Sequence, residues 1–178
     1  PSSTASGSNS AALGMQAQAK VAGSLAAGAA AQATKDGSTA VGTWTEATAE
    51  KTTALGDSAH ATTNRATALG HDSQATGEFS TAAGVSSRAS GSASVATGKN
   101  ATASGANTIA IGNAANAAGT DSIATGRQAA TTGSNAIATG ADSSAANNAS
   151  AYGNKAKATG GWSSAFGNES KAAAADAS

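Results

Sequence analysis

The sequence predicts an all-β fold, a parallel β-solenoid in which each coil takes about fourteen residues. Three observations support this prediction. Glycine recurs at a nearly constant interval, alanine stands two residues before each of those glycines, and large apolar side chains are scarce. A fixed short period is typical of proteins in which one small unit stacks on the next.

The glycine register extends through almost the whole chain. Every step is fourteen residues as far as Gly140, the next step is thirteen, and the last is again fourteen. We expect the thirteen-residue step, over Ala141–Gly153, to lose its residue from a turn. The twelve closing glycines are Gly14, Gly28, Gly42, Gly56, Gly70, Gly84, Gly98, Gly112, Gly126, Gly140, Gly153 and Gly167.

Each repeat divides into two halves of about seven residues. A second alanine column lies five residues after each closing glycine, from Ala19 to Ala172, with Thr131 as its exception. Seven residues hold one short strand and one tight turn, so two halves form one coil. Glycine suits such turns because a positive φ costs it no steric clash. Twelve coils stacked ~4.8 Å apart give a rod of roughly 55 Å. A helical solenoid is disfavoured because regular glycines would weaken every helix.

The alanine before each closing glycine is predicted to face the coil interior, because side chains alternate across a strand. A narrow coil has room only for methyl-sized groups. This accounts for a chain with 3% aromatic residues and one methionine. The predicted interior residues include Ala54, Ala68, Ala82, Ala96, Ala110, Ala124 and Ala138.

The second half of each repeat predicts a polar wall that faces solvent. Its strands read small, polar, small, and the polar residue changes from coil to coil while its neighbours stay small. A partner would meet the protein here. The candidate ligand-facing residues of this polar wall are Gln74, Arg88, Thr102, Asn116 and Lys157.

The first half of each repeat predicts an apolar face. Residues on either side of the interior alanine must point outward, yet many of them are large and apolar. An apolar strip along a rod requires a cover, and the simplest cover is another copy of the chain related by an axis along the rod. The candidate seam residues are Leu55, Leu69, Val95, Ile109, Ile111, Ile123, Ile137, Tyr152 and Phe166.

Composition excludes several functions. The formal net charge is zero and 11% of residues are charged, so the chain lacks the basic stripe of a nucleic-acid-binding protein. No stretch approaches the ~18 apolar residues of a membrane-spanning helix. The chain shows no initiator methionine and no signal peptide, and we therefore expect a fragment of a longer protein.

Neither catalysis nor a metal or cofactor site is predicted. His71, Asp72 and Ser73 are the residue types of a catalytic triad, but neighbours in sequence point to different sides and cannot form its geometry. His60 falls in the polar wall without a cluster of further metal ligands, which favours a solvated side chain. Residues 98–100 lack the spacing of a P-loop.

Three aromatic residues, Trp44, Phe79 and Trp162, fall near turns outside the apolar columns. Exposed aromatic side chains can anchor a partner. Local packing over a turn is the preferred interpretation.

Phrases such as those at 107–112 (NTIAIG) and 121–126 (DSIATG) resemble the head repeat of YadA-like trimeric autotransporter adhesins. The resemblance extends from Gly7 to about Ala172. It implies a left-handed parallel β-roll, a homotrimer, and display on the outer membrane of a Gram-negative bacterium. It also implies attachment to host cells or extracellular-matrix proteins, without catalysis.

The repeat departs from the family pattern in places. The phrase weakens to Thr-Ala-Leu-Gly at 53–56 and 67–70, and Lys35, Ala49 and Thr63 stand where other repeats have a second glycine. We expect residues 1–178 to be one head array of about twelve coils, with no neck, stalk or membrane anchor. Contact with a membrane would then occur only through an anchor outside this stretch.

Two other functions stay open. The rod could be a passive spacer that lifts another domain from the cell surface. An ice-binding solenoid is a further alternative, although that function requires a regular threonine ladder. Here the ladder is broken, with Thr39, Thr53, Thr67 and Thr81 followed by Val95.

Overall fold

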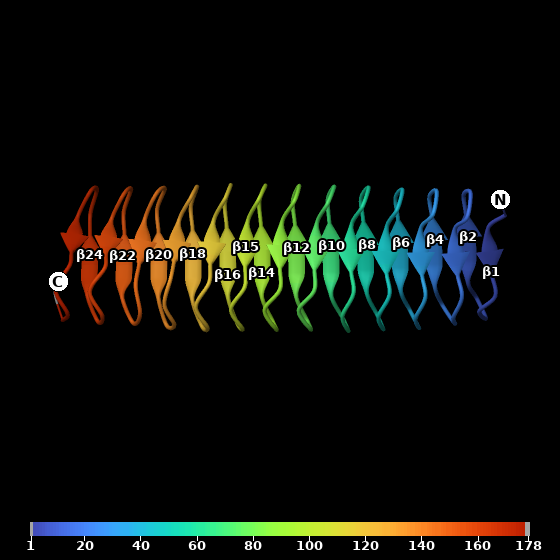
Figure 1. Cartoon of the computed structure of the whole chain (residues 1–178), viewed down its shortest axis with the longest axis horizontal. Coiled ribbons are helices and arrows are strands. Elements are labelled where there is room, and N and C mark those ends of the chain that lie inside the picture. The colour runs from blue at the N-terminus through green and yellow to red at the C-terminus, as the bar shows by residue number, and fades with distance from the viewer. Residues whose placement is uncertain (1, 177–178) are drawn as a thin grey trace.

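The computed structural model describes residues 2–176 and is a rod of short strands and turns, with the two termini at opposite ends (Figure 1). The strands form two sheets, and every strand pairs in parallel with the equivalent strand of the neighbouring coil. The predicted parallel β-solenoid is therefore confirmed. Over the same residues, no helix is long and apolar enough to cross a membrane.

The polar half of each repeat forms a thirteen-stranded sheet of two-residue strands. Its members are β1 (Thr4–Ala5), β3 (Gln18–Ala19), β5 (Gln32–Ala33), β7 (Glu46–Ala47), β9 (His60–Ala61), β11 (Gln74–Ala75), β13 (Arg88–Ala89), β15 (Thr102–Ala103), β17 (Asn116–Ala117), β19 (Ala130–Thr131), β21 (Ser144–Ala145), β23 (Lys157–Ala158) and β25 (Lys171–Ala172).

The half that ends in a closing glycine forms a twelve-stranded sheet of three-residue strands. Its members are β2 (Ala11–Leu13), β4 (Leu25–Ala27), β6 (Thr39–Val41), β8 (Thr53–Leu55), β10 (Thr67–Leu69), β12 (Thr81–Ala83), β14 (Val95–Thr97), β16 (Ile109–Ile111), β18 (Ile123–Thr125), β20 (Ile137–Thr139), β22 (Ser150–Tyr152) and β24 (Ser164–Phe166).

The strand register follows the repeat, so that equivalent residues of successive coils lie side by side. Ala68, for example, pairs with Ala54 on one side and Ala82 on the other. The thirteen-residue step keeps this register, because Ala138 still pairs with Ala151. The missing residue comes from the link between β21 and β22, residues 146–149, which is one shorter than the link 132–136 between β19 and β20. The prediction that a turn loses the residue is confirmed.

The coil interior is lined by small side chains from both sheets. The structure places the seven predicted interior alanines inside, all with no exposed surface. It also buries a row of hydroxyl residues two positions earlier, which sequence analysis did not assign to the interior. They are Ser24, Ser38, Thr52, Ser80, Ser94, Thr108, Ser122 and Ser163.

Most of these buried hydroxyls donate to the carbonyl three residues earlier in the turn. Ser94 Oγ donates to Gly91 O at 2.6 Å, and Thr108 Oγ1 donates to Gly105 O at 2.7 Å. Burial of a hydroxyl costs little when it has such a partner. The side chain also ties the turn to the strand that follows.

The closing glycines are required by two features of their turns. Their φ values range from 112° to 137°, a region that residues with a Cβ rarely adopt. They also approach the next coil closely. A Cβ added to Gly112 would lie 2.5 Å from Gly126 O.

The second glycine of a repeat, found in the turn before the three-residue strand, does not have the positive φ that we predicted for turn glycines. Gly77 and Gly91 do not have a positive φ, and the left-handed residue of this turn stands two positions later, as at Phe79. Lys35 can therefore stand at this position, because no positive φ is required there. The turn is the same in both cases: Ser38 N donates to Lys35 O at 3.1 Å, and Ser80 N donates to Gly77 O at 3.2 Å.

We expect Gly112→Ala to lower the free energy of unfolding by about 2 kcal/mol or more, because the new methyl group meets a carbonyl and the φ is unfavourable. Gly161→Ala is the matched control, since its Cβ would have no neighbour closer than 3.9 Å. Urea denaturation followed by circular dichroism measures both. Equal stability of the two variants would contradict the role given to close coil stacking.

A second pair of variants tests the buried hydroxyls. Ser94→Ala removes a buried hydrogen bond and should lower the free energy of unfolding by about 1 kcal/mol. Ser80 lies one coil earlier in the same row, but its buried Oγ has no hydrogen-bond partner. Ser80→Ala should therefore leave stability unchanged or raise it slightly, again in urea denaturation. An equal loss in both variants would show that the hydroxyl contacts are unimportant.

Candidate functional site

The polar wall is the outer face of the thirteen-stranded sheet. Gln74, Arg88, Thr102 and Asn116 lie side by side in one row, since each pairs with the next. Lys157 lies in the same row three coils further along. Arg88, Asn116 and Lys157 are exposed, and the other two side chains are half-buried. The five candidates therefore share one face without forming one compact cluster.

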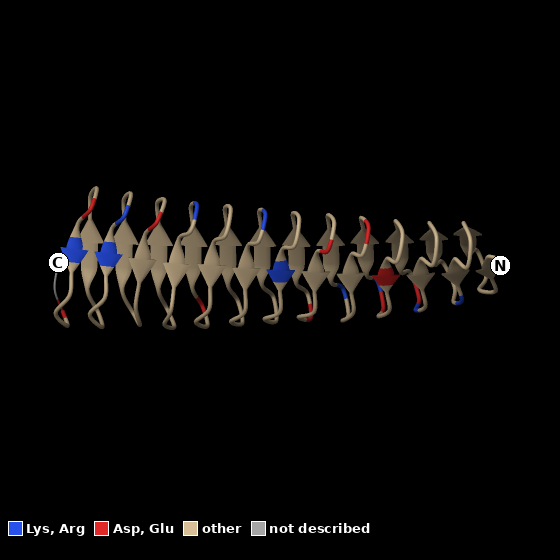
Figure 2. Cartoon of the chain, turned by 45° about the horizontal axis from the view of Figure 1, so that its top comes forward, with Lys and Arg blue, Asp and Glu red and all other residues tan. Residues whose placement is uncertain are grey.

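Charge is distributed unevenly along this face. The two strands nearest the C-terminus, β23 and β25, each place a lysine on it, whereas β7 places Glu46 near the other end (Figure 2). Lys157 and Lys171 are register partners. Like charges opposite one another repel, so this end of the wall favours an acidic partner over a basic one.

His60 has a carboxylate partner that sequence analysis missed. His60 Nδ1 lies 3.0 Å from Glu46 Oε2, and the two residues are register partners on β9 and β7. The spacing of fourteen residues was the available signal, because it places residues side by side in adjacent coils. Among residues 2–176 there is no group of three or more potential metal ligands.

The contacts of His71 argue against a triad. Its Nδ1 lies 3.1 Å from an Asp72 carboxylate oxygen in an exposed turn. Ser73 instead points into the coil interior, where its Oγ has no hydrogen-bond partner. A buried hydroxyl cannot act as a nucleophile on an external substrate in this arrangement.

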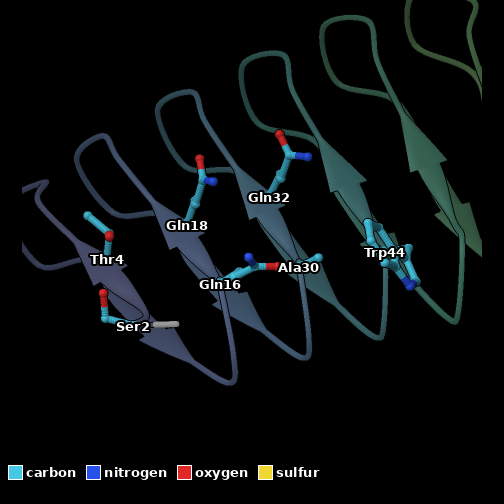
Figure 3. Close-up of a pocket in the computed structure, with 7 residues that line it drawn as sticks. All are labelled: Ser2, Thr4, Gln16, Gln18, Ala30, Gln32 and Trp44. Atoms are coloured by element: carbon cyan, nitrogen blue, oxygen red, sulfur yellow. The ribbon is translucent and has the colours of Figure 1, made fainter.

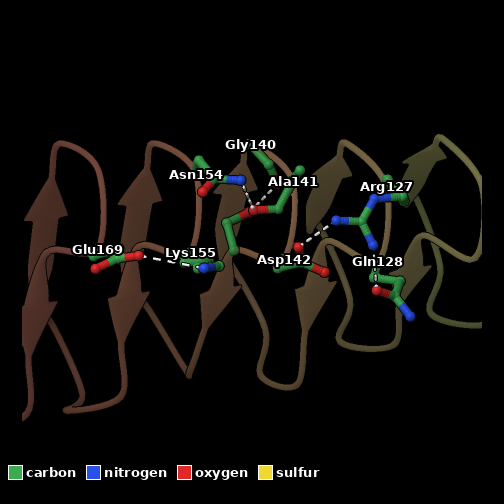
Figure 4. Close-up of polar contacts among 9 residues, drawn as sticks. Arg127, Gln128, Gly140, Ala141, Asp142, Asn154, Lys155 and Glu169 are labelled. Atoms are coloured by element: carbon green, nitrogen blue, oxygen red, sulfur yellow. Dashed lines mark hydrogen bonds and ion pairs between the residues drawn. The ribbon is translucent and has the colours of Figure 1, made fainter.

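The turns that follow the closing glycines carry polar contacts between successive coils (Figure 4). Arg127 pairs with Asp142, and Lys155 Nζ lies 3.3 Å from Glu169 Oε1. Between these pairs, Asn154 Nδ2 donates to Ala141 O at 3.2 Å. Exposed ion pairs of this kind contribute little stability each. Their effect is to order the turn side chains along the rod.

The apolar face is the outer face of the twelve-stranded sheet. Leu55, Ile111, Tyr152 and Phe166 are exposed, with 48%, 42%, 36% and 66% of their surface accessible. The rings of Tyr152 and Phe166 are stacked with centroids 5.2 Å apart. The remaining five candidate seam residues lie half-buried on the same face: Leu69, Val95, Ile109, Ile123 and Ile137.

All three turn aromatics have left-handed backbone conformations, at φ 56° for Trp44, 58° for Phe79 and 61° for Trp162. Phe79 packs locally, with the Arg65 guanidinium 5.2 Å from its ring centroid. The two tryptophans are 64% and 68% exposed. Local packing therefore describes Phe79 better than it describes either tryptophan.

One shallow groove lies next to Trp44, near the N-terminal end (Figure 3). It has a volume of about 310 Å³. It is formed where the first-turn residues, which stand two positions after the closing glycines, meet the polar wall. Its lining residues are Ser2, Thr4, Gln16, Gln18, Ala30, Gln32 and Trp44.

These features define a repeat protein of the β-roll class, with one polar and one apolar outer face. A family model for the YadA head domain repeat matches residues 1–19, 22–43, 47–73, 75–101, 103–129 and 117–143, which together make up most of the chain. The chain therefore belongs to the YadA head domain family. It is an adhesin head of the type found in trimeric autotransporters, and the resemblance seen in the sequence is confirmed.

Among solved structures, one similar structure is the crystal structure of the collagen-binding domain of the Yersinia adhesin YadA. The match has 27% sequence identity and a TM-score of 0.44, and it covers 80% of this chain and 65% of that chain. A search of curated proteins finds no match.

Proposed function

We propose that this chain is the head of a homotrimeric surface adhesin that attaches to a host matrix protein or cell-surface receptor. The observation that carries the proposal is the difference between the two outer faces of the rod. One face is polar and varied, whereas the opposite face presents an apolar strip, interrupted at β12, with no cover in the single chain.

The apolar strip supports association along the length of the rod. Exposed apolar side chains extend from Leu55 on β8 to Phe166 on β24, so a partner must cover the strip over many coils. A second and third copy with the same repeat present the same strip at the same spacing. Three copies around an axis along the rod would bury all three strips and leave the polar walls outside.

The polar wall supports attachment through many weak contacts. Its residues repeat once per coil at a fixed spacing, and a trimer would display three such rows. Weak contacts repeated on a rigid support add up to high avidity without a deep binding pocket. In this proposal residues 1–178 form a single array exposed on the outer membrane, as part of a longer passenger chain, and the rod itself performs no catalysis.

Ile111→Asp tests the trimer. Ile111 is exposed on the apolar face, and a charge there would be buried and unpaired in the assembly. Sedimentation velocity should show a trimer for the unchanged chain and a mainly monomeric species for the variant. Asn116→Asp on the opposite face is the control and should stay trimeric. A stable monomer of the unchanged chain at micromolar concentration would exclude the proposed assembly.

The triple change of Gln74, Arg88 and Asn116 to alanine tests attachment. We expect about a tenfold loss of binding to whichever of collagen, fibronectin, laminin or epithelial cells the unchanged chain binds, since three side chains of one row are removed. A solid-phase assay measures the loss, and sedimentation confirms that the variant remains trimeric. Gln128→Ala in a turn is the control.

Two results of that assay would contradict the proposal in different ways. Full binding by the triple variant would show that the polar wall is not the contact surface. If the unchanged chain bound no member of the panel, a passive spacer would become the better account of the rod.

A further inference from the structure

The groove beside Trp44 is formed by two parallel rows of side chains. Gln16, Ala30 and Trp44 come from the first turns of three successive coils, and Gln18 and Gln32 come from the polar wall beside them (Figure 3). The rows repeat with the coils, so equivalent atoms recur at roughly the 4.8 Å spacing of paired strands. The lining side chains are therefore regularly spaced along the groove.

Trp44 occupies an unfavourable conformation without the benefit of burial. Its φ of 56° is rare for a bulky side chain, and 64% of its surface is accessible. The equivalent positions in neighbouring coils hold Ala30 and Ser58, so the fold does not require an aromatic residue there. The left-handed backbone is a property of the turn in each of these coils, and the exposed indole is what the fold leaves unexplained. An exposed aromatic side chain beside a groove is available to a ligand.

The polar groups of the groove are uncharged and unused. No hydrogen bond joins the side-chain amides of Gln16, Gln18 or Gln32 to another group in residues 2–176. None of the seven lining residues is charged. The next wall residue, Glu46, is engaged by His60 at 3.0 Å. Each free amide offers both a donor and an acceptor to a neutral ligand.

We propose that this groove binds a neutral oligosaccharide. The apolar face of one sugar ring would stack on the Trp44 indole, as aromatic side chains offer a large, rigid contact surface. Hydroxyl groups of the adjoining sugars would exchange hydrogen bonds with the amides of Gln16, Gln18 and Gln32.

A proline-rich extended peptide fits the groove less well. It too could stack on an indole, but its backbone offers mainly carbonyl acceptors. The three glutamine carbonyls would then lose water without gaining donors, which is unfavourable. Hydroxyl groups, which both donate and accept, satisfy the two halves of each amide.

The groove lies where the turns that follow β2, β4 and β6 meet the polar wall, and none of its lining residues is one of the candidate seam residues. Sugar binding does not depend on the proposed trimer or on attachment to a matrix protein, and it should survive in the monomeric Ile111→Asp variant. Failure of one proposal is therefore distinguishable from failure of the other.

The test uses the full 178-residue chain and two neutral probes, lacto-N-tetraose and chitohexaose. The chain has two tryptophans, so in the Trp162→Ala variant fluorescence reports on Trp44 alone. We expect a saturable fluorescence change with at least one probe. By calorimetry, Trp44→Ala should weaken binding about tenfold or more, and Gln32→Ala should weaken it less.

Equivalent positions in other coils and the second tryptophan provide the controls. Ala30 and Ala114 already occupy the position of Trp44 in other coils, with φ of 57° and 55°, so Trp44→Ala should fold normally. Trp162→Ala changes an equally exposed tryptophan outside the groove and should leave the affinity unchanged. Circular dichroism checks the fold of each variant.

Three results would overturn the inference. One is the absence of any heat or fluorescence change with both probes up to on the order of 10 mM. Another is an equal loss of affinity in the Trp44 and Trp162 variants. The third is saturation of the Trp44 signal by a (Pro-Pro-Gly)-repeat peptide and not by the sugars, which would make the groove a peptide site.

Discussion

The close contact between successive closing glycines allows the coils to stack at strand-pairing distance along the whole rod. Across most of the array, the position where a Cβ would lie is within 3 Å of the glycine carbonyl group in the next coil. A side chain at this point would push the coils apart and break the hydrogen bonds of both sheets. Each coil holds only about fourteen residues, in two strands of two or three residues, so the two sheets lie close together and only small side chains fit between them. The shortage of large apolar residues is thus a consequence of the short coil, while the glycines allow such coils to stack.

The interior remains partly polar without a large energetic cost. Hydroxyls that point inward donate to turn carbonyls or to one another, as Thr131 Oγ1 does to Ser122 Oγ at 2.9 Å. Near this pair the buried alanines divide into two clusters, one ending at Ala129 and the other beginning at Ala136. The strand pairing continues across the division. Hydrogen bonds between coils therefore maintain the rod where apolar contact is interrupted.

The sequence period was sufficient to predict the coils, the two strands in each, and the turn that loses a residue. It succeeded because glycine and alanine occur where the geometry leaves little choice. The inward direction of Ser94 was not predicted, since serine is common on both faces of a strand. The His60–Glu46 contact and the groove at Trp44 were missed because both depend on which side chains lie beside each other in adjacent coils. Composition within one repeat does not contain that information.

The direction of the backbone hydrogen bonds has a mechanical consequence. In both sheets these bonds join one coil to the next and so run along the rod, in line with any tension applied between its ends. Bonds in this arrangement are loaded one coil at a time, from the end at which the force enters. Each released coil adds fourteen residues of free chain, or up to ~48 Å of length. A tethered rod under shear would thus lengthen in uniform steps and lower the force on its attachment point.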